Sequence, residues 1–306
     1  MNFYKTVLNI LSLFLALFCN FDKVESVKKI SPENSLVGIN RDNIKICLNN
    51  CHLTIRGKGC YEINRNFFGK FKHLKRFVKS ISFEGNIVSI GDYAFSYFTN
   101  LRSVKIPKSV ESIGEYAFNC CFNLNSVIFE GPSSVKTIGS NAFRCSDIVS
   151  INIPKSVESI GKEAFAHCDK LKFVKFENPN LIEKIDSRTF AYCQNLIEIN
   201  IPESVKEIGN SAFHHCDSLV SVKIPDSVER IKKDSFSDCI SLTFTNIPNS
   251  IKLIDSYAFA GCNLSYINKI PDSVEKVAKN AFDDCINIIF DPIEYSNQMV
   301  IEEYKN

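Results

Sequence analysis

The chain has 306 residues, of which 45% are hydrophobic and 23% are charged, and these proportions are ordinary for a globular chain. They exclude wholesale disorder, a collagen-like sequence and a polytopic membrane protein. The 36 basic and 34 acidic residues give a net charge of +2, so neither nucleic acid nor anionic lipid is expected as a partner. Two other counts, 25 Phe and 13 Cys, need the internal pattern of the chain to explain them.

Residues 1–26 are predicted to be a signal peptide. A single Lys precedes an apolar run over residues 7–18, which is too short for a membrane-spanning helix and typical of the hydrophobic region of a secretory signal. Cleavage is expected between Cys19 and Ser26. No later stretch has 18 consecutive apolar residues, so no membrane span is expected. The mature chain is therefore predicted to be secreted or held at the extracellular surface.

Residues 27–80 are predicted to form an N-terminal cap. This segment contains Cys47, Cys51 and Cys60, and in an oxidising compartment we expect one disulfide among them, although the spacing does not give the connectivity. A zinc site that combines these cysteines with His52 is the alternative, and their irregular spacing disfavours it.

Residues 81–290 repeat one pattern about nine times, and residues 291–306 are predicted to be a C-terminal cap or tail. Each copy contains a Phe that follows a small residue or Thr, and successive Phe are 22–25 residues apart, at Phe95, Phe118, Phe143, Phe165, Phe190, Phe213, Phe236, Phe259 and Phe282. A degenerate tenth copy is indicated by matching offsets at Phe68, Phe71 and Leu74. A period of this length is typical of a solenoid, in which each coil buries its core only by stacking on its neighbours.

Each copy predicts a short strand, a turn and a short helical or 3₁₀ segment. Residue types alternate over residues 219–224, which is the period of a strand, and Pro225 ends the strand because it cannot donate to a ladder. Glycines such as Gly91 and Gly114 then suit a turn with positive φ. The small residue before each Phe allows the helical segment to approach the core. The predicted fold class is an α/β solenoid.

The pattern L-x-x-V-x-I-P-x-S-V-x-x-I-G-x-x-A-F-x-x-C, clearest in residues 106–127 and 224–244, resembles the BspA-type leucine-rich repeat. The resemblance implies a leucine-rich repeat arc with a parallel sheet on its concave face and helical or 3₁₀ segments on its convex face. Members of that family are mostly surface-exposed or secreted proteins associated with adhesion and host-molecule binding. The resemblance therefore implies a protein or glycan partner outside the cell.

The repeat also contains a recurring Cys two or three residues after the Phe, at Cys121, Cys145, Cys168, Cys193, Cys216, Cys239, Cys262 and Cys285. These are predicted to be buried free thiols, because parallel side chains in register do not converge to disulfide geometry. The pairs His167-Cys168 and His215-Cys216 suggest metal ligands. However, a Cys in the core leaves its neighbouring His pointing outward, so no shared metal site is expected.

No catalytic motif occurs in the sequence, so the protein is predicted not to be an enzyme and to need no cofactor. The predicted function is partner binding by the concave face, where residues between the inward-facing strand positions project, namely Lys105, Ile128, Phe173, Lys175, Glu198, Lys223, Phe244 and Tyr266. The simpler interpretation is that the apolar members only cover one another along the sheet. A self-assembling surface coat and a secreted inhibitor or decoy are the alternative functions, and the sequence indicates neither the partner nor the oligomeric state.

Overall fold

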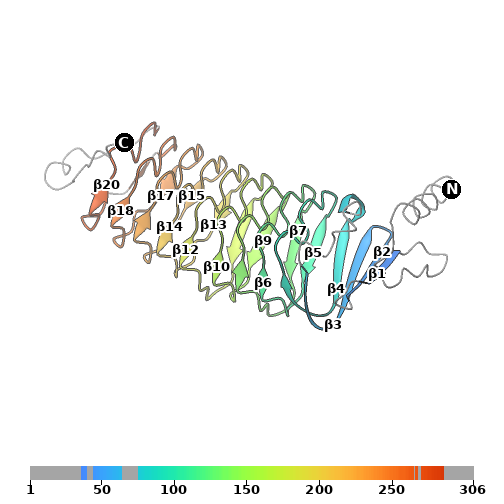
Figure 1. Cartoon of the computed structure of the whole chain (residues 1–306). Coiled ribbons are helices and arrows are strands. Elements are labelled where there is room, and N and C mark those ends of the chain that lie inside the picture. The colour runs from blue at the N-terminus through green and yellow to red at the C-terminus, as the bar shows by residue number, and fades with distance from the viewer. Residues whose placement is uncertain (1–35, 40–43, 64–74, 265, 268–269, 286–306) are drawn as a thin grey trace.

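The computed structural model describes residues 36–39, 44–63, 75–264, 266–267 and 270–285. The predicted signal peptide, the degenerate copy around Phe68 and Phe71, and the C-terminal tail lie outside the described residues. Figure 1 shows the coils stacked side by side along one long axis, with the N-terminal strands at one end and β20 at the other. The molecule is a parallel-strand β-solenoid.

The N-terminal end begins with four strands, β1 (Leu36–Ile39), β2 (Lys45–Asn49), β3 (His52–Ile63) and β4 (Ser80–Ile90), of which β3 and β4 are much longer than the strands of the repeats. β1, β2 and β3 pair antiparallel, and β3 then pairs parallel with β4. Asn50 and Cys51 connect β2 to β3 with φ of 46° and 67°. Two consecutive positive φ angles are what a two-residue hairpin turn requires.

From β4 onward each coil contributes one strand to a first ladder, as predicted. Its members are β5 (Ser103–Ile106), β7 (Ser126–Phe129), β9 (Ser150–Ile153), β11 (Phe173–Phe176), β13 (Glu198–Ile199), β15 (Ser221–Val222), β17 (Phe244–Thr245) and β19 (Tyr266–Ile267). The pairing is parallel and in register, for example Phe173 between Ser150 and Glu198. It is interrupted between β7 and β9, and between β13 and β15 it is reduced to one bridge from Asn200 to Lys223. Burial alternates along β9 and β11, so one side of this ladder faces the core and the other faces solvent.

Each coil also contributes a two-residue strand to a second parallel ladder, which the sequence did not predict. Its members are β6 (Ser112–Ile113), β8 (Thr137–Ile138), β10 (Ser159–Ile160), β12 (Lys184–Ile185), β14 (Glu207–Ile208), β16 (Arg230–Ile231), β18 (Leu253–Ile254) and β20 (Lys276–Val277). The pairing is interrupted between β10 and β12, after the two extra residues Asn178-Pro179. Two residues carry no measurable periodicity, which is why the pattern did not reveal these strands.

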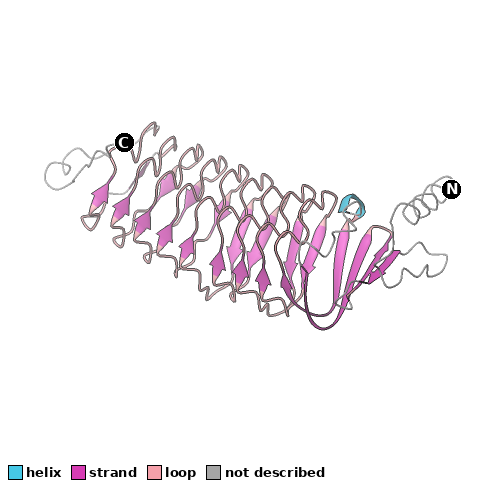
Figure 2. Cartoon of the chain, viewed as in Figure 1, coloured by secondary structure: helices cyan, strands magenta, loops and turns pink. Residues whose placement is uncertain are grey.

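The predicted helical or 3₁₀ segments of the repeats are wrong, and so is the predicted α/β class. Among the described residues the only helical element is one short 3₁₀ turn at 75–77, the cyan segment in Figure 2. The segment that contains the Phe is instead a series of turns, here called the turn ladder. Its alternate amides donate to the next coil: Tyr93 to Glu115, Phe95 to Ala117 and Tyr97 to Asn119. The amides between them donate three residues back within their own coil.

This alternation explains the missing helix. A segment of about eight residues is too short to be a stable helix alone, and bonds to the neighbouring coil satisfy half of its amides. The geometry requires positive φ at two positions per coil, for example Tyr93 (56°) and Tyr97 (63°). Non-glycine residues occupy most of these positions, so inter-coil bonding outweighs their conformational strain.

The repeat glycines are present for a different reason than expected. None of Gly114, Gly139, Gly161 and Gly209 has a positive φ. A Cβ atom on Gly139 would lie 2.6 Å from the carbonyl carbon of Gly114 in the preceding coil. The glycines therefore permit close approach of neighbouring coils, and the prediction of a positive-φ turn at these positions is wrong.

The repeat Phe residues form one continuous column through the core, here called the Phe spine. Phe95 to Phe259 are fully buried in eight successive coils, and Phe282 at the end is partly buried. Successive rings are close to parallel, with centroids 5.1–5.6 Å apart. Rings at this spacing are in contact, so the spine couples each coil to the next.

The repeat cysteines form a second column, here called the thiol ladder. Each sulfhydryl donates to the carbonyl of the Phe one coil earlier over 2.9–3.3 Å, from Cys121, Cys168, Cys193, Cys216, Cys239, Cys262 and Cys285. All are free thiols, which agrees with the prediction. Cys145 is the exception, because Ser146 fills the buried slot and donates to Phe143 over 2.7 Å. The expected ladder position of Cys145 is therefore wrong.

Candidate functional site

The solvent side of the first ladder carries the residues predicted to bind a partner. Lys105, Lys175 and Lys223 are exposed, and Ile128 and Phe173 expose 47% and 46% of their surfaces. Glu198 is also exposed, next to Phe173 in register. The backbones of Phe244 and Tyr266 are paired in register in β17 and β19, and their side chains lie outside the described part.

Three further exposed apolar residues each lie one residue before a strand of the first ladder. Val149, Ile197 and Val220 are 40%, 42% and 49% exposed. The carbonyl of Val149 accepts from the amide of Lys172, whose carbonyl in turn accepts from Ile197, so Val149 and Ile197 lie two rungs apart. We call the solvent side of the first ladder, with these three residues, the partner face.

Sequence reasoning missed these three residues because it assumed strict alternation. Val220 and Ser221 are consecutive and both exposed, since the backbone changes direction between the buried Leu219 and strand β15. The available signal was an apolar residue directly after the repeat leucine, or after Ile148 in its place.

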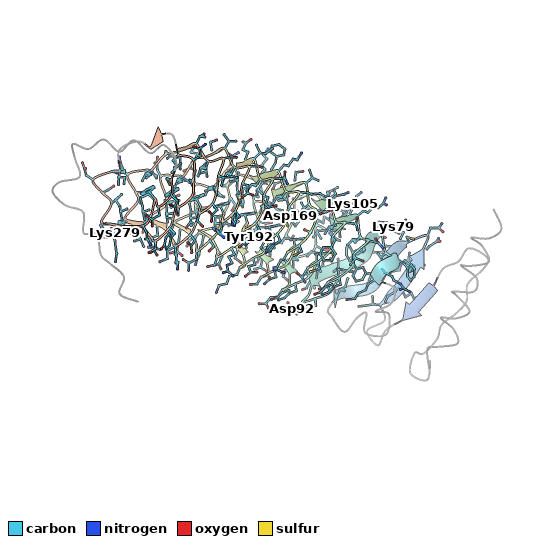
Figure 3. The ribbon with its side chains drawn as sticks, turned by 90° about the horizontal axis from the view of Figure 1, so that it is seen from above. Lys79, Asp92, Lys105, Asp169, Tyr192 and Lys279 are labelled. Atoms are coloured by element: carbon cyan, nitrogen blue, oxygen red, sulfur yellow. The ribbon has the colours of Figure 1, made fainter. Side chains whose placement is uncertain are left out.

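Charge on the partner face is mixed and weakly paired. Lys223 lies 3.6 Å from the Glu203 carboxylate, and both side chains are more than 70% exposed, so this ion pair contributes little to stability. Lys105 neighbours Ile128 in register, and Figure 3 shows Lys105 at the surface of the rod. Lys175 pairs in register with Asn152, so the cationic side chains of this face lie beside an aliphatic and an amide side chain.

The second ladder presents a different surface, made of mutually paired charges. Glu207 lies between Lys184 at 3.0 Å and Arg230 at 2.9 Å on the adjacent strands. Burial alone would raise the pKa of Glu207, but the hydrogen bonds from Arg230 and Lys184 outweigh it and the pKa is lowered. The hydrogen bond to Glu207 also raises the pKa of Lys184. These charges satisfy one another, so this surface offers less to a partner than the partner face does.

The cysteines of the predicted cap lie around the β2–β3 hairpin. Cys47 in β2 and Cys51 in the turn are free thiols, and the side chain of Cys60 lies outside the described part, so a cap disulfide stays a prediction. The ring nitrogens of His52 lie 2.7 Å from Ser80 Oγ and 2.9 Å from Ser82 Oγ. His52 is thus held against β4 by both nitrogens, and a zinc ion bound there would have to replace one of these hydrogen bonds.

Both His-Cys pairs are arranged as predicted. Cys168 and Cys216 are fully buried, whereas His167 and His215 are partly exposed. The contacts of His215 were not predicted: it lies beside His214 and beside Asp238 of the next coil. Donor atoms of these three residues lie within 4.8 Å of one another.

No helix in the described ranges is long and apolar enough to cross a membrane.

Comparison with known proteins gives one family match. The model of the BspA type leucine rich repeat region matches residues 71–181 and 172–289, with six copies. No curated protein matches the chain.

Several solved structures are similar to this chain. A leucine rich cell surface protein from Faecalibacterium prausnitzii A2-165 is 21% identical, with a TM-score of 0.44, and the match covers 89% of this chain and 95% of that one. A leucine rich repeat protein from T. pallidum is 23% identical, with a TM-score of 0.42, over 77% of this chain and 89% of that one. At identities and scores this low, nothing about function is transferred from them.

Proposed function

Because the chain belongs to the BspA-type leucine-rich repeat family, we propose that it acts outside the cell as a surface or secreted protein that binds a protein or glycan partner through the partner face. The proposed setting is adhesion or interaction with host molecules, and the predicted signal peptide at residues 1–26 supports an extracellular location. The proposed role is non-catalytic, as befits a repeat scaffold.

The observation that carries the proposal is the row of exposed apolar side chains on the partner face. Ile128, Val149, Phe173, Ile197 and Val220 are each at least 40% exposed, in or directly before strands whose other solvent-facing residues are mostly polar. Exposed apolar groups ringed by polar ones are typical of interaction sites. A large aromatic among them, here Phe173, is the usual kind of energetic anchor.

The test compares two sets of variants. The first combines Phe173→Ser, Ile197→Ser and Val220→Ser on the partner face. The matched control combines Leu181→Ser and Tyr257→Ser, two apolar residues of 57% and 38% exposure that lie outside the strands of the first ladder. Binding is measured to a panel of immobilised extracellular glycoproteins and glycans, and melting curves establish that both variants fold.

The proposal expects the partner-face variant to lose binding and the control to keep it. Equal binding by both variants would move the site away from this face. Light scattering on the unmodified protein separates partner binding from self-assembly, because a coat protein would form large oligomers and a binding protein would not need to.

A further inference from the structure

Outside the partner face, one group of side chains on the turn ladder has the composition of a metal site. His214 and His215 follow Phe213 of the spine, and Asp238 is the equivalent of His215 one coil later. The Asp238 Oδ2 lies 3.7 Å from the Nδ1 of His214 and 3.9 Å from the Nε2 of His215. Three donor atoms on two adjacent coils therefore face a common point.

The backbone fixes this arrangement. His215 and Asp238 both have positive φ, 55° and 58°, and their amides donate to the next coil, to Ser237 and Ala260 respectively. The two side chains therefore project from equivalent positions of stacked coils. Tyr192, in the same position one coil earlier, stacks on the ring of His215 at 5.2 Å and meets the ring of His214 edge-on at 5.1 Å. Figure 3 places Tyr192 near the middle of the rod.

A separate observation concerns the other nitrogen of His215. Its Nδ1 lies 3.5 Å from the Oδ1 of Asp217, and that oxygen is buried with no hydrogen-bond partner. A histidine that binds a metal through Nε2 usually donates its Nδ1–H to a carboxylate, which orients the ring and raises its basicity. His215 thus has Asp238 at one nitrogen and, at the other, a carboxylate oxygen with no hydrogen-bond partner, an arrangement that resembles the outer shell of a histidine metal ligand.

We propose that His214, His215 and Asp238 bind one divalent transition-metal ion, with Asp217 as the outer-shell carboxylate. Two imidazoles and a carboxylate suit Zn²⁺ and leave a coordination position open for water or a partner group. Zinc–ligand distances of about 2.0–2.1 Å place tetrahedral donors roughly 3.3 Å apart. The two separations from Asp238 to the histidines, 3.7 and 3.9 Å, need to shorten by about half an ångström, and the two histidine nitrogens, within 4.8 Å of each other, close the remaining gap by side-chain rotation.

One hydrogen bond of His214 bears directly on this site. Ser237 Oγ lies 2.6 Å from the Nδ1 of His214, and a metal bound at Nδ1 replaces this hydrogen bond. Ser237 therefore competes with the metal and does not assist it.

Equivalent positions in other coils show which substitutions the backbone tolerates. Tyr192 occupies the position of His215 one coil earlier and Gly261 occupies that of Asp238 one coil later, so His215→Tyr and Asp238→Gly place residues that this backbone already accommodates. His167→Tyr is the matched control, because His167 occupies the same position two coils before His215 and lies outside the cluster. Ser237→Ala is compatible with the fold because Ala260 fills the equivalent position.

The test is a titration of the purified protein with Zn²⁺ after alkylation of its accessible thiols, followed by Co²⁺ as a spectroscopic probe. We expect one Zn²⁺ per chain with a dissociation constant in the micromolar range or below. Asp217→Asn should weaken binding about 10–100-fold, as loss of an outer-shell partner does, and His215→Tyr and Asp238→Gly should weaken it more. His167→Tyr should leave the affinity unchanged, and Ser237→Ala should keep or increase it.

The Co²⁺ complex should show d–d absorption without a thiolate charge-transfer band. The proposal is overturned if the protein binds no Zn²⁺ at millimolar concentration, or if His215→Tyr and Asp238→Gly bind it as well as the unmodified protein. A thiolate band would overturn it too, since the ion would then be held by cysteines. Melting curves of all variants without metal exclude loss of binding through unfolding.

Discussion

Two buried side chains in most coils, a Phe and a Cys, join the coil to its neighbours. The Phe of the spine stacks on the Phe of the next coil, and the Cys donates a hydrogen bond to the carbonyl of the Phe one coil earlier. Both contacts link neighbouring coils, and neither links two parts of the same coil. Damage at one residue should therefore spread to its neighbours.

Phe190→Ala should lower the free energy of unfolding by about 3–5 kcal/mol, because Phe190 is fully buried and its removal leaves a cavity and two unstacked rings. Urea unfolding followed by circular dichroism measures the change. Phe122→Ala is the control, since Phe122 is 49% exposed and its loss should cost no more than about 0.5 kcal/mol. Equal effects of the two substitutions would contradict the placement of the spine in the core.

The thiol ladder predicts a loss of stability in alkali. Burial raises the pKa of Cys121 and of Cys168 from 9.0 to about 12, so the folded chain keeps these protons while the unfolded chain releases them above pH 9. The contribution of these thiols to the free energy of unfolding is therefore fully present below pH 9 and is lost as pH rises toward 12. The free energy of unfolding should fall by up to about 1.4 kcal/mol per pH unit for each such thiol.

Urea unfolding at a series of pH values between 8 and 11 measures this slope. Cys168→Ser keeps a donor at that position, as Ser146 does in the preceding coil, but removes one ionisable group. Its slope should be shallower than that of the unmodified protein. An identical slope would show that Cys168 ionises equally in both states.

At the scale of the structural element, the sequence predicted the strands that depend on the pattern within one copy. It missed the elements that depend on hydrogen bonds to neighbouring coils. The first ladder follows from alternation around Val222 and from the Pro that ends each strand. The second ladder, represented by Glu207–Ile208, and the turn ladder, represented by Phe95, arise from hydrogen bonds to residues more than 20 positions away. A pattern read within one copy does not contain that information, so the convex segment was predicted to be helical.

The close approach of coils predicts that Gly139→Ala destabilises the protein by about 1–3 kcal/mol, the usual cost of overpacking. The added Cβ would lie 2.6–2.8 Å from backbone atoms of Gly114 and Glu115. The midpoint of urea unfolding measures the change, which should leave the denaturant dependence unaltered.

Gly131→Asn is the control for that substitution. Gly131 has a φ of +57° and open space around its Cβ direction, and Asn tolerates that conformation. Its unfolding midpoint should stay close to that of the unmodified protein. Similar losses at Gly139 and Gly131 would indicate that backbone conformation, and not contact between coils, is what these glycines provide.

At the scale of the whole molecule, the fold was more predictable than the sites. Nine copies of one pattern specify a solenoid and its Phe spine, and Phe173 and Lys175 were correctly expected on the solvent side of the first ladder. Val149, Ile197 and the group around His215 depend on how a coil turns and on which residues of the next coil lie beside it. These features depend on which residues of adjacent coils become neighbours, and the repeat pattern shows this only once the conformation of a single coil is known.

The central claim is that the partner face contacts the partner, and lysine footprinting tests it most directly. The protein is acetylated with and without the partner identified by the binding panel, and mass spectrometry measures the modification of each lysine. Lys105, Lys175 and Lys223 are exposed on the partner face, whereas Lys136 and Lys233 are exposed elsewhere. The account predicts that the partner protects the first three and leaves the last two unchanged; protection of Lys136 and Lys233 with none at Lys175 and Lys223 would contradict it.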